Sequence, residues 1–288
     1  MRLLSGRNVI ITGASRGLGL HVAQAMWAHG ANLLLAARSA PLLGDLRDKL
    51  TAYGQAEQTI NSVSVDFKFP EAAGVVIDAA RQVWTRLDGL VNNAGIIGPI
   101  GPAWENDWSD WRDTIQVNLL TPVALCRACV PWMKAGGGGK IINLSGGGAT
   151  GPRPNFSAYA TAKTGVVRFT EILAQETKAY NIQVNSIAPG ALNTAMLQAV
   201  LEAGPEKAGP KEYAQSLTQV EKGGSDPMNA ADLCVWLASS DSAGVTGKLI
   251  SAVWDPWKDL PKRLPDLVDT DIYTLRRIVP GDRGKEWG

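Results

Sequence analysis

The sequence contains few residues of the kinds that stabilise small secreted proteins or bind metal ions. Its 288 residues include three cysteines and two histidines. Three cysteines are too few for a disulfide framework in a chain of this size, and they favour a reducing, cytoplasmic setting. His21 and His29 share one predicted helix and lack the nearby thiols or carboxylates of a metal site. We therefore predict no bound metal ion.

Charge of one sign and long apolar runs are also absent. Lys and Arg total 28 against 27 Asp and Glu, which gives a formal net charge of +1. Such a balance offers no extended field to attract nucleic acid or anionic lipid. The sequence lacks both the uniform apolar stretch of a membrane-spanning helix and the signature of a signal peptide. We expect a globular protein whose partner is a small molecule, with no nucleic acid and no membrane.

Short apolar runs alternate with helix-like segments along most of the chain. The runs cover residues 8–12, 32–36, 60–65, 87–92, 140–144, 182–187 and 248–253. This alternation predicts βαβ units and a parallel sheet with helices on both faces. Val9, Ile10 and Ile11 follow one another without a polar residue, as is typical of a strand buried on both sides. The sequence therefore predicts a doubly wound α/β fold over residues 1–253.

The composition changes near residue 251. Fourteen of the last 38 residues are charged, seven of each sign. Four apolar residues nevertheless keep a helical spacing between two prolines, namely Val268, Ile272, Leu275 and Val279. We predict that residues 254–288 form a charged extension with a short docked helix.

A glycine-rich turn follows the first predicted strand. It reads Thr12-Gly13-Ala14-Ser15-Arg16-Gly17-Leu18-Gly19 and is followed by a helical segment over residues 21–28. Glycines at such a turn let the backbone approach a pyrophosphate, whose charge is met by N–H groups and the helix dipole. The alternative is a tight turn with no ligand. The strand–turn–helix context favours a dinucleotide site.

The end of the second predicted strand distinguishes NADP from NAD. A carboxylate there accepts hydrogen bonds from the adenosine ribose, whereas an arginine pairs with a 2′-phosphate. This sequence has Arg38 and no acid at that place, and Arg16 adds a second cation. We therefore predict NADP(H) over NAD(H), with two solvated arginines as the alternative.

A tyrosine and a lysine stand four residues apart in a predicted helix over residues 156–180. Tyr159 and Lys163 therefore share one helix face. A free tyrosine has a pKa near ~10, and a cation at ~4 Å could lower that pKa by up to ~3 units. The pair predicts a tuned proton donor, although by itself the spacing also fits an ordinary exposed face.

Further motifs lie where strands of the predicted sheet end. Asn93, Ala94 and Gly95 close the fourth strand, and Pro189-Gly190 follow the sixth, with Thr194 just beyond. Asn118 lies in the helical segment after the fourth strand. Ligands of doubly wound sheets bind at this carboxyl edge. With the glycine turn and the Tyr159/Lys163 pair, these motifs make the chain resemble the short-chain dehydrogenase/reductase family over about residues 4–253.

The resemblance implies a single-domain Rossmann fold with a seven-stranded parallel sheet. In family terms Tyr159 is the general acid that protonates a carbonyl oxygen, Lys163 lowers the pKa of Tyr159 and binds the nicotinamide ribose, and Asn118 holds a water in the proton relay. Tyr159 and Lys163 also contact the cofactor, and the other implied cofactor-binding residues are Gly13, Ser15, Arg16, Gly17, Leu18, Gly19, Arg38, Asp66, Asn93, Ala94, Gly95, Pro189, Gly190 and Thr194. The family also implies a mobile lid over residues 191–224 and a homodimer or homotetramer.

One family position departs from the pattern. The substrate-orienting serine of the family falls at Gly146 here, and Ser145 stands one residue earlier. Losing one donor to a developing oxyanion typically costs ~10²- to 10³-fold in rate. Three replacements remain open: Ser145 re-aimed by the following glycines, a backbone N–H of Gly147 or Gly148, or a hydroxyl of the substrate. We include Ser145 among the predicted catalytic residues.

Other signals receive structural readings. Cys126 and Cys129 have a redox-like spacing but stand late in a helix, so we interpret them as core thiols. Trp104 belongs to a tryptophan stripe that is typical of a core, and it is also a candidate wall of the substrate pocket. Arg153 is interpreted as a solvated loop charge, with contact to an anionic substrate as the alternative.

The motifs together predict an NADPH-dependent oxidoreductase that reduces a ketone or aldehyde to an alcohol, or catalyses the reverse. The alternative is a non-catalytic NADPH-binding or regulatory protein whose glycine at position 146 records lost chemistry. Retention of Tyr159, Lys163 and Asn118 favours the enzyme, because a proton donor and its tuning cation are specific to catalysis.

Overall fold

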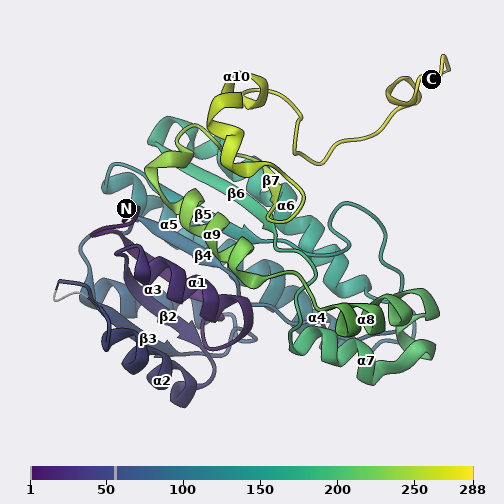
Figure 1. Ribbon diagram of the computed structural model, residues 1–288, viewed down its shortest axis with the longest axis horizontal. Helices are drawn as coiled ribbons and strands as arrows, with labels where there is room; N and C mark the ends of the chain where they lie inside the picture. The colour runs from purple at the N-terminus through teal and green to yellow at the C-terminus, as the bar shows by residue number, and fades with distance from the viewer. Residues whose placement is uncertain (1, 55–56, 288) are drawn as a thin grey trace.

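Seven parallel strands form the centre of the molecule in the computed structural model, which describes residues 2–54 and 57–287 (Figure 1). The strands are β1 (Asn8–Thr12), β2 (Asn32–Ala37), β3 (Ile60–Ser64), β4 (Gly89–Asn92), β5 (Gly139–Leu144), β6 (Ile182–Ala188) and β7 (Leu249–Ser251). Their order is β3-β2-β1-β4-β5-β6-β7. The winding therefore reverses between β1 and β4, which is where such sheets bind ligands. The predicted doubly wound Rossmann fold is confirmed.

Helices cover both faces of the sheet, because each inner strand carries apolar side chains on both sides. Val9 and Ile11 pack with α1, α2 and α9, whereas Ile10 packs on the opposite face with α3, α5 and α6. The helices that cover the sheet are α1 (Gly17–Ala28), α2 (Ala40–Thr51), α3 (Ala72–Val83), α5 (Thr121–Ala135), α6 (Ser157–Thr177) and α9 (Pro227–Ala238).

A π-helical turn interrupts one long helical segment. Helix α4 (Trp108–Ile115) runs directly into π-helix Gln116–Leu120, which runs into α5. The turn contains Asn118, whose side chain is fully buried. Because π turns are rare and concentrate at functional sites, this one marks the helix that passes behind the carboxyl ends of β4 and β5.

Two helices project beyond the carboxyl ends of the strands. Helices α7 (Ala195–Ala208) and α8 (Pro210–Lys222), drawn in green at the right of Figure 1, pack against each other as a hairpin. Gly209 separates them with a φ of 88°, a conformation that favours glycine. Thr194 caps the start of α7 by accepting a hydrogen bond from the Met196 N–H. This hairpin occupies the position of the predicted lid.

The helix predicted over residues 268–279 is not present. The final α-helix is α10 (Leu264–Leu267), and the chain after it is irregular apart from the 3₁₀ turn Pro280–Arg283. Asp269 and Tyr273 adopt positive φ values of 57° and 60°, which a right-handed helix cannot contain. The apolar spacing did not produce a helix because Val268 and Ile272 stay largely exposed and gain little from burial.

Hydrogen bonds from backbone and side-chain groups hold the extension against the last strand instead. The Leu249 N–H donates to the Tyr273 carbonyl at 2.8 Å, and the Lys248 ammonium donates to the carbonyls of Thr270 and Ile272. The Leu275 N–H donates to the Glu171 carboxylate at 2.6 Å. The extension therefore covers part of the free edge of β7.

Three 3₁₀ turns join elements of the second half of the chain, at Lys178–Tyr180, Ser240–Ser242 and Trp257–Arg263. None of the helices in residues 2–54 and 57–287 is long and apolar enough to span a bilayer.

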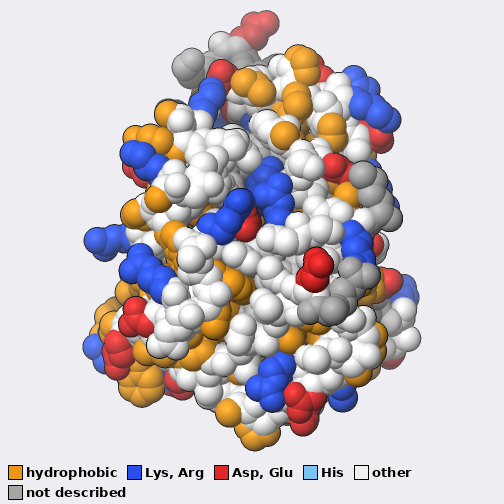
Figure 2. Space-filling view, turned by 90° about the vertical axis from the view of Figure 1, so that its left-hand side faces the viewer, with side chains coloured by type: hydrophobic (Ala, Val, Ile, Leu, Met, Phe, Trp, Pro, Cys, Tyr) orange, Lys and Arg blue, Asp and Glu red, His pale blue; other side chains and the backbone are white. Residues whose placement is uncertain are grey.

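Figure 2 shows the left-hand side of Figure 1, away from α7 and α8, where basic and acidic side chains are scattered among uncharged ones. That face carries no large patch of one sign, in agreement with the balanced composition.

Candidate active site

A cleft of about 1320 Å³ opens at the carboxyl ends of the strands. It brings together nearly all the residues predicted for the site, although they come from many different segments of the sequence. The predicted residues that line it are Gly13, Ser15, Arg16, Gly17, Leu18, Arg38, Asp66, Asn93, Ala94, Gly95, Ser145, Tyr159, Lys163, Pro189, Gly190 and Thr194. Gly19 and Asn118 lie behind its wall.

The glycine turn fits tightly against the loop after β4. A Cβ on Gly19 would lie 2.2 Å from the Gly13 carbonyl oxygen, and a Cβ on Gly13 would lie 2.8 Å from the Ala94 Cα. Gly13 and Gly17 also have φ values of 67° and 55°. Glycine is therefore required at this turn for packing as well as for backbone conformation.

Side chains fix the same two loops to each other. The N–H groups of Asn93 and Ala94 both donate to the Thr12 hydroxyl at 3.0 Å. The Asn93 amide donates back to the carbonyls of Thr12 at 3.0 Å and Gly13 at 3.2 Å. The floor of the cleft between β1 and β4 is thus held in one shape.

The start of α1 is suited to an anionic group. Arg16 precedes the helix without a side-chain cap, and the first turn contains no acidic residue. Arg38 follows β2 and lines the same cleft as Arg16, and both side chains are exposed to it. Asp66 accepts a hydrogen bond from the Lys68 N–H at 3.0 Å, which orients its carboxylate at the cleft. These donors and cations fit a phosphorylated dinucleotide.

Tyr159 and Lys163 lie on the inner face of α6, and both are buried. The Lys163 ammonium is 5.6 Å from the centroid of the Tyr159 ring and donates a hydrogen bond to the Leu144 carbonyl at 2.8 Å. Burial lowers the pKa of Lys163 to about 8. The exposed-face alternative for this pair is therefore excluded.

The direction of the pKa shift of Tyr159 corrects the sequence-based expectation. Burial raises the pKa of the Tyr159 phenol, because its charged form loses water, and the nearby Arg153 cation opposes that rise. A buried phenol of this kind holds its proton firmly until a partner in the cleft accepts it.

The side chain of Asn118 is occupied by the backbone of the protein. Its amide nitrogen donates to the carbonyls of Ile96 and Thr114, and its oxygen accepts from the Ile96 N–H at 3.1 Å. The Asn118 amide therefore positions the loop after β4 and does not face the cleft. A role in holding water, as the resemblance implied, would fall to the backbone of the π turn.

Ser145 and Gly146 show what the departure from the family pattern does. The Ser145 N–H continues the sheet by donating to the Ile187 carbonyl at 2.8 Å. The Ser145 hydroxyl is buried and has no hydrogen-bond partner among the described residues. A Cβ on Gly146 would lie 2.3 Å from the Tyr159 hydroxyl oxygen, so that oxygen occupies the space that a side chain would fill.

Arg153 is not a solvated loop charge. Its side chain is 20% exposed and pairs with Glu212 of α8, whose side chain is 26% exposed. The Arg153 guanidinium lies 4.0 Å from the ring centroid of Phe156 and 5.8 Å from that of Tyr159. Sequence reasoning missed Glu212 altogether, because nothing near it in the chain indicates a contact with a residue 59 positions away.

Apolar side chains form the rest of the substrate half of the cleft. Phe156 and Tyr159 pack with Val200 and Ala208 of the lid, and Met196 packs against this cluster. Trp104 does not belong to the wall, because its side chain is 85% exposed and lies outside the cleft. The loop that carries it turns the indole toward solvent.

The cysteines take no part in the cleft. All three are buried and free, and burial raises the pKa of Cys126 to about 12. A thiol in that state is not reactive at neutral pH. The prediction of core thiols is confirmed for Cys126 and Cys129.

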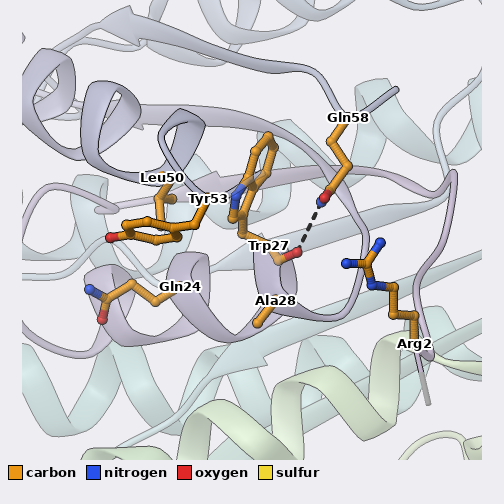
Figure 3. Close-up of a pocket in the computed structure, with 7 residues that line it drawn as sticks. All are labelled: Arg2, Gln24, Trp27, Ala28, Leu50, Tyr53 and Gln58. Atoms are coloured by element: carbon orange, nitrogen blue, oxygen red, sulfur yellow. Dashed lines mark hydrogen bonds between the residues drawn. The ribbon is translucent and has the colours of Figure 1, made fainter. Parts of the chain in front are cut away.

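A second, smaller cavity of about 350 Å³ lies away from the cleft (Figure 3). Seven residues of α1, α2 and their neighbouring loops line it, and none of them was predicted for the site: Arg2, Gln24, Trp27, Ala28, Leu50, Tyr53 and Gln58. Gln58 donates to the Trp27 carbonyl at 2.9 Å across this cavity. The described part of the chain contains no cluster of three or more His, Cys, Asp or Glu that could hold a metal ion.

Comparison with known proteins assigns the family. The sequence matches the family described as short chain dehydrogenase over residues 7–204. The chain therefore belongs to the short-chain dehydrogenase family, and it is an NAD(P)-dependent oxidoreductase that acts on alcohol or carbonyl groups.

Individual relatives cover most of the chain. A trans-4-hydroxycyclohexanecarboxylate dehydrogenase of Sinomonas cyclohexanicum is 35% identical over 83% of this chain and 88% of its own. A 3beta-hydroxysteroid dehydrogenase of Eggerthella lenta is 34% identical over 85% of this chain and 91% of its own. The solved structure of L-sorbose reductase from Gluconobacter frateurii, complexed with NADPH and L-sorbose, matches with a TM-score of 0.77 and 30% identity over 87% of this chain and 97% of that one.

Proposed function

We propose that this protein is an NADPH-dependent carbonyl reductase that converts a ketone or aldehyde to an alcohol, and the reverse when the alcohol is in excess. The observation that carries the proposal is the meeting of Tyr159 and Lys163 with the glycine turn in one cleft. A phenol that can give a proton and a dinucleotide cradle are the two parts that carbonyl reduction needs.

The residues of the cradle have distinct proposed roles. The N–H groups at the start of α1 bind the pyrophosphate, Arg16 and Arg38 bind the 2′-phosphate, and Asp66 binds the adenine. Asn93 and Gly95 shape the floor beneath the nicotinamide ribose. The opposite side of the cleft is lined by Pro189, Gly190 and Thr194. When bound, the nicotinamide supplies or accepts the hydride.

The proton comes from this chain. Tyr159 donates its phenolic proton to the carbonyl oxygen as the carbon is reduced, and recovers a proton from solvent afterwards. Lys163 stays protonated below its pKa of about 8 and stabilises the phenolate left behind. Asn118 positions the loop over Lys163, and the buried hydroxyl of Ser145 is a second donor at the cleft.

The activity is tested by following NADPH absorbance against a panel of ketones and aldehydes. We expect turnover by the wild-type protein and a loss of at least ~10³-fold in Tyr159→Phe, which removes the acid and keeps the ring. Tyr53→Phe, at an exposed tyrosine outside the cleft, is the matched control. Equal rates for Tyr159→Phe and wild type would refute the proposed mechanism.

The preference for NADPH is tested by binding. Each arginine contributes a charge-assisted hydrogen bond to the 2′-phosphate, so Arg38→Leu and Arg16→Leu should weaken NADPH binding by ~10- to 100-fold. Their affinity for NADH should stay within about twofold. Arg47→Leu, which removes an exposed arginine paired with Asp48, serves as the control. Tighter binding of NADH than of NADPH by the wild type would refute the preference.

A non-catalytic NADPH-binding protein is the second candidate, and Gly146 is the observation that favours it. Tight NADPH binding without turnover of any compound in the panel would support this alternative.

We further propose a cytoplasmic homodimer or homotetramer in which residues 254–288 form an extension of the catalytic domain. Light scattering of the full chain tests its mass.

A further inference from the structure

The substrate half of the cleft contains one cation that the family pattern does not explain. We propose that Arg153 is a further catalytic residue: its Nη1 donates a hydrogen bond to the reacting oxygen in place of the missing serine, and Glu212 of the lid positions it. This inference rests on the proposed carbonyl reduction.

The glycine run makes room for the guanidinium. A Cβ on Gly147 would lie 3.5 Å from Arg153 Nη1 and 3.8 Å from its Cζ, so the guanidinium packs directly against the bare backbone there. The Arg153 Cβ lies 3.2 Å from the position that a Cβ on Gly148 would take. A Cβ on Gly147 would make ordinary contact with the guanidinium, whereas a Cβ on Gly148 would crowd Ala160 at 2.6 Å and the Arg153 Cβ at 3.2 Å. The same run that removes the serine hydroxyl therefore admits a cation beside the Tyr159 ring.

Glu212 leaves one edge of the guanidinium available. Both Nε, at 3.2 Å, and Nη2 of Arg153 donate to the same carboxylate oxygen of Glu212. No hydrogen bond of Nη1 is found among the described residues, and Nη1 is the nitrogen nearest to Gly147. Because a guanidinium is planar and rigid, a carboxylate on one edge fixes the direction of the opposite N–H groups.

The ion pair also couples the arginine to the lid. Glu212 belongs to α8, whereas Arg153 precedes α6 in the loop after the glycines. A half-buried guanidinium without an anion is unfavourable next to the apolar ring of Phe156. Closure of α8 therefore places the Arg153 donor, and departure of α8 removes its anchor.

The electrostatics of Tyr159 agree with this geometry. The cations that face its ring are Arg153 at 5.8 Å and Lys163 at 5.6 Å, and Glu212 is paired with Arg153. Arg153 opposes the rise in the pKa of the Tyr159 phenol that burial causes. In the reduction, hydride bonds to the carbonyl carbon and the Tyr159 proton bonds to the oxygen. Arg153 keeps its own protons and stabilises the charge that develops on that oxygen.

A first experiment needs no substrate. The phenolate absorbance of the protein is titrated with pH, and the Tyr159→Phe curve is subtracted to isolate Tyr159. Arg153→Gln should raise the apparent pKa of Tyr159 further, because Arg153 is the cation that opposes the rise caused by burial. Glu206→Gln, which alters an exposed lid acid, is the control and should leave the Tyr159 titration unchanged. An unchanged Tyr159 titration in Arg153→Gln would overturn the proposal.

A second experiment uses an uncharged ketone that the wild type reduces. Arg153→Ala should lose ~10²-fold in kcat with NADPH affinity within about twofold of wild type, and added guanidinium should restore part of the rate. Arg153→Lys should restore less than guanidinium does, since an ammonium cannot make the same two-edged contact. Glu212→Gln should show an intermediate loss, recovered by Glu212→Asp.

Three results would overturn the assignment. The first is a loss confined to KM for ketones that carry a carboxylate, because Arg153 would then anchor the substrate and not the reacting oxygen. The second is a ~10²-fold loss in Ser145→Ala with full activity in Arg153→Ala. The third is a wild type that reduces no carbonyl, which refutes the proposed function and the catalytic step together. The titration still reports separately whether Arg153 and Tyr159 interact.

Discussion

A buried lysine side chain lies near each end of strand β5, and the two lysines differ in their neighbouring groups. Lys140 lies at the start of the strand, and Lys163 binds the Leu144 carbonyl at its end. Both ammonium groups are almost completely buried, and burial lowers the pKa of each to about 8. By charge, burial and pKa the two are nearly equivalent.

Their neighbours separate them. The Lys140 ammonium donates to the Ser242 hydroxyl at 3.0 Å, and that hydroxyl in turn donates to the Leu237 and Ser239 carbonyls. The Lys163 ammonium faces the cleft, next to the Tyr159 phenol and the unpartnered Ser145 hydroxyl. One end of β5 is closed by a 3₁₀ turn, and the other opens to a space large enough for a cofactor.

A shifted pKa therefore does not by itself locate an active site in this molecule. The shift follows from burial, which both ends of the strand share. What distinguishes the carboxyl end is the cleft beside it, which the Tyr159 phenol and the unpartnered Ser145 hydroxyl line. Substitutions matched between the two ends test this difference.

The largest contrast is expected between the two lysines themselves. Lys163→Met should lower turnover by at least ~10³-fold, because the Tyr159 phenolate formed in each cycle loses its stabilising cation. Lys140→Met should change turnover by less than about twofold, since Lys140 lies at the far end of the strand. Steady-state NADPH oxidation measures both. Equal losses would mean that Lys163 acts through the fold alone.

The backbone at the carboxyl ends of the strands should tolerate an added Cβ less well than the surface of the protein does. Gly19→Ala should weaken NADPH binding by ~10²-fold or more, because the new Cβ lies 2.2 Å from the Gly13 carbonyl and forces the turn apart. Gly44→Ala in α2 meets no atom within 4 Å and should instead stabilise the protein by about 0.5–1 kcal/mol. Fluorescence titration and thermal unfolding test the pair. NADPH binding by Gly19→Ala at wild-type strength would show that the cradle is not at this turn.

A smaller effect is expected at the position of the missing serine. Gly146→Ala places a Cβ 2.3 Å from the Tyr159 oxygen, so the phenol must shift and kcat should fall by ~10²-fold. NADPH affinity should hold, because the cradle is untouched. Gly151→Ala, in the same loop with no atom within 4 Å, is the control. Unchanged kcat in Gly146→Ala would mean that catalysis does not depend on the present position of the Tyr159 hydroxyl oxygen.

Local patterns predicted the parts of the molecule that local forces determine. The apolar run at residues 8–12 became β1 with the predicted bounds, and the run at 32–36 became a strand one residue longer. The glycine turn and Tyr159/Lys163 could be identified because each is a short motif with its own steric or helical reason. Their meeting in one cleft followed from the parallel order of the strands.

Features that depend on tertiary contacts could not be predicted from the sequence. The pairing of Arg153 with Glu212 joins a loop to helix α8, and the two segments share no motif. The direction of the Tyr159 pKa shift depends on how deeply α6 is buried, which the spacing to Lys163 cannot show. In the tail, a hydrogen bond to the Glu171 carboxylate and hydrogen bonds from the Lys248 ammonium prevailed over a helical apolar spacing at Val268 and Ile272. The helical spacing of apolar residues was present in the tail, but these side chains had no core surface to pack against.

The smallest predicted effect concerns stability at the closed end of β5. The pKa of Lys140 is about 8 in the folded protein and 10.5 when unperturbed. Between these values the unfolded chain binds more protons than the folded one, so the contribution of Lys140 to stability rises with pH. Below about pH 8 both states are protonated, and the cost of the buried charge is fully present.

Comparison with Lys140→Met isolates this contribution, because all other titrating groups are common to the two proteins. The stability of the wild type relative to Lys140→Met should increase by about 1–2 kcal/mol from pH 7 to pH ~10.5, as measured by urea unfolding. Lys49→Met, at an exposed lysine of α2, should show no such trend. A difference that stays constant with pH would mean that Lys140 remains protonated throughout. The closed end of the strand would then stabilise its charge better than the open end does, and the equivalence of the two lysines would fail.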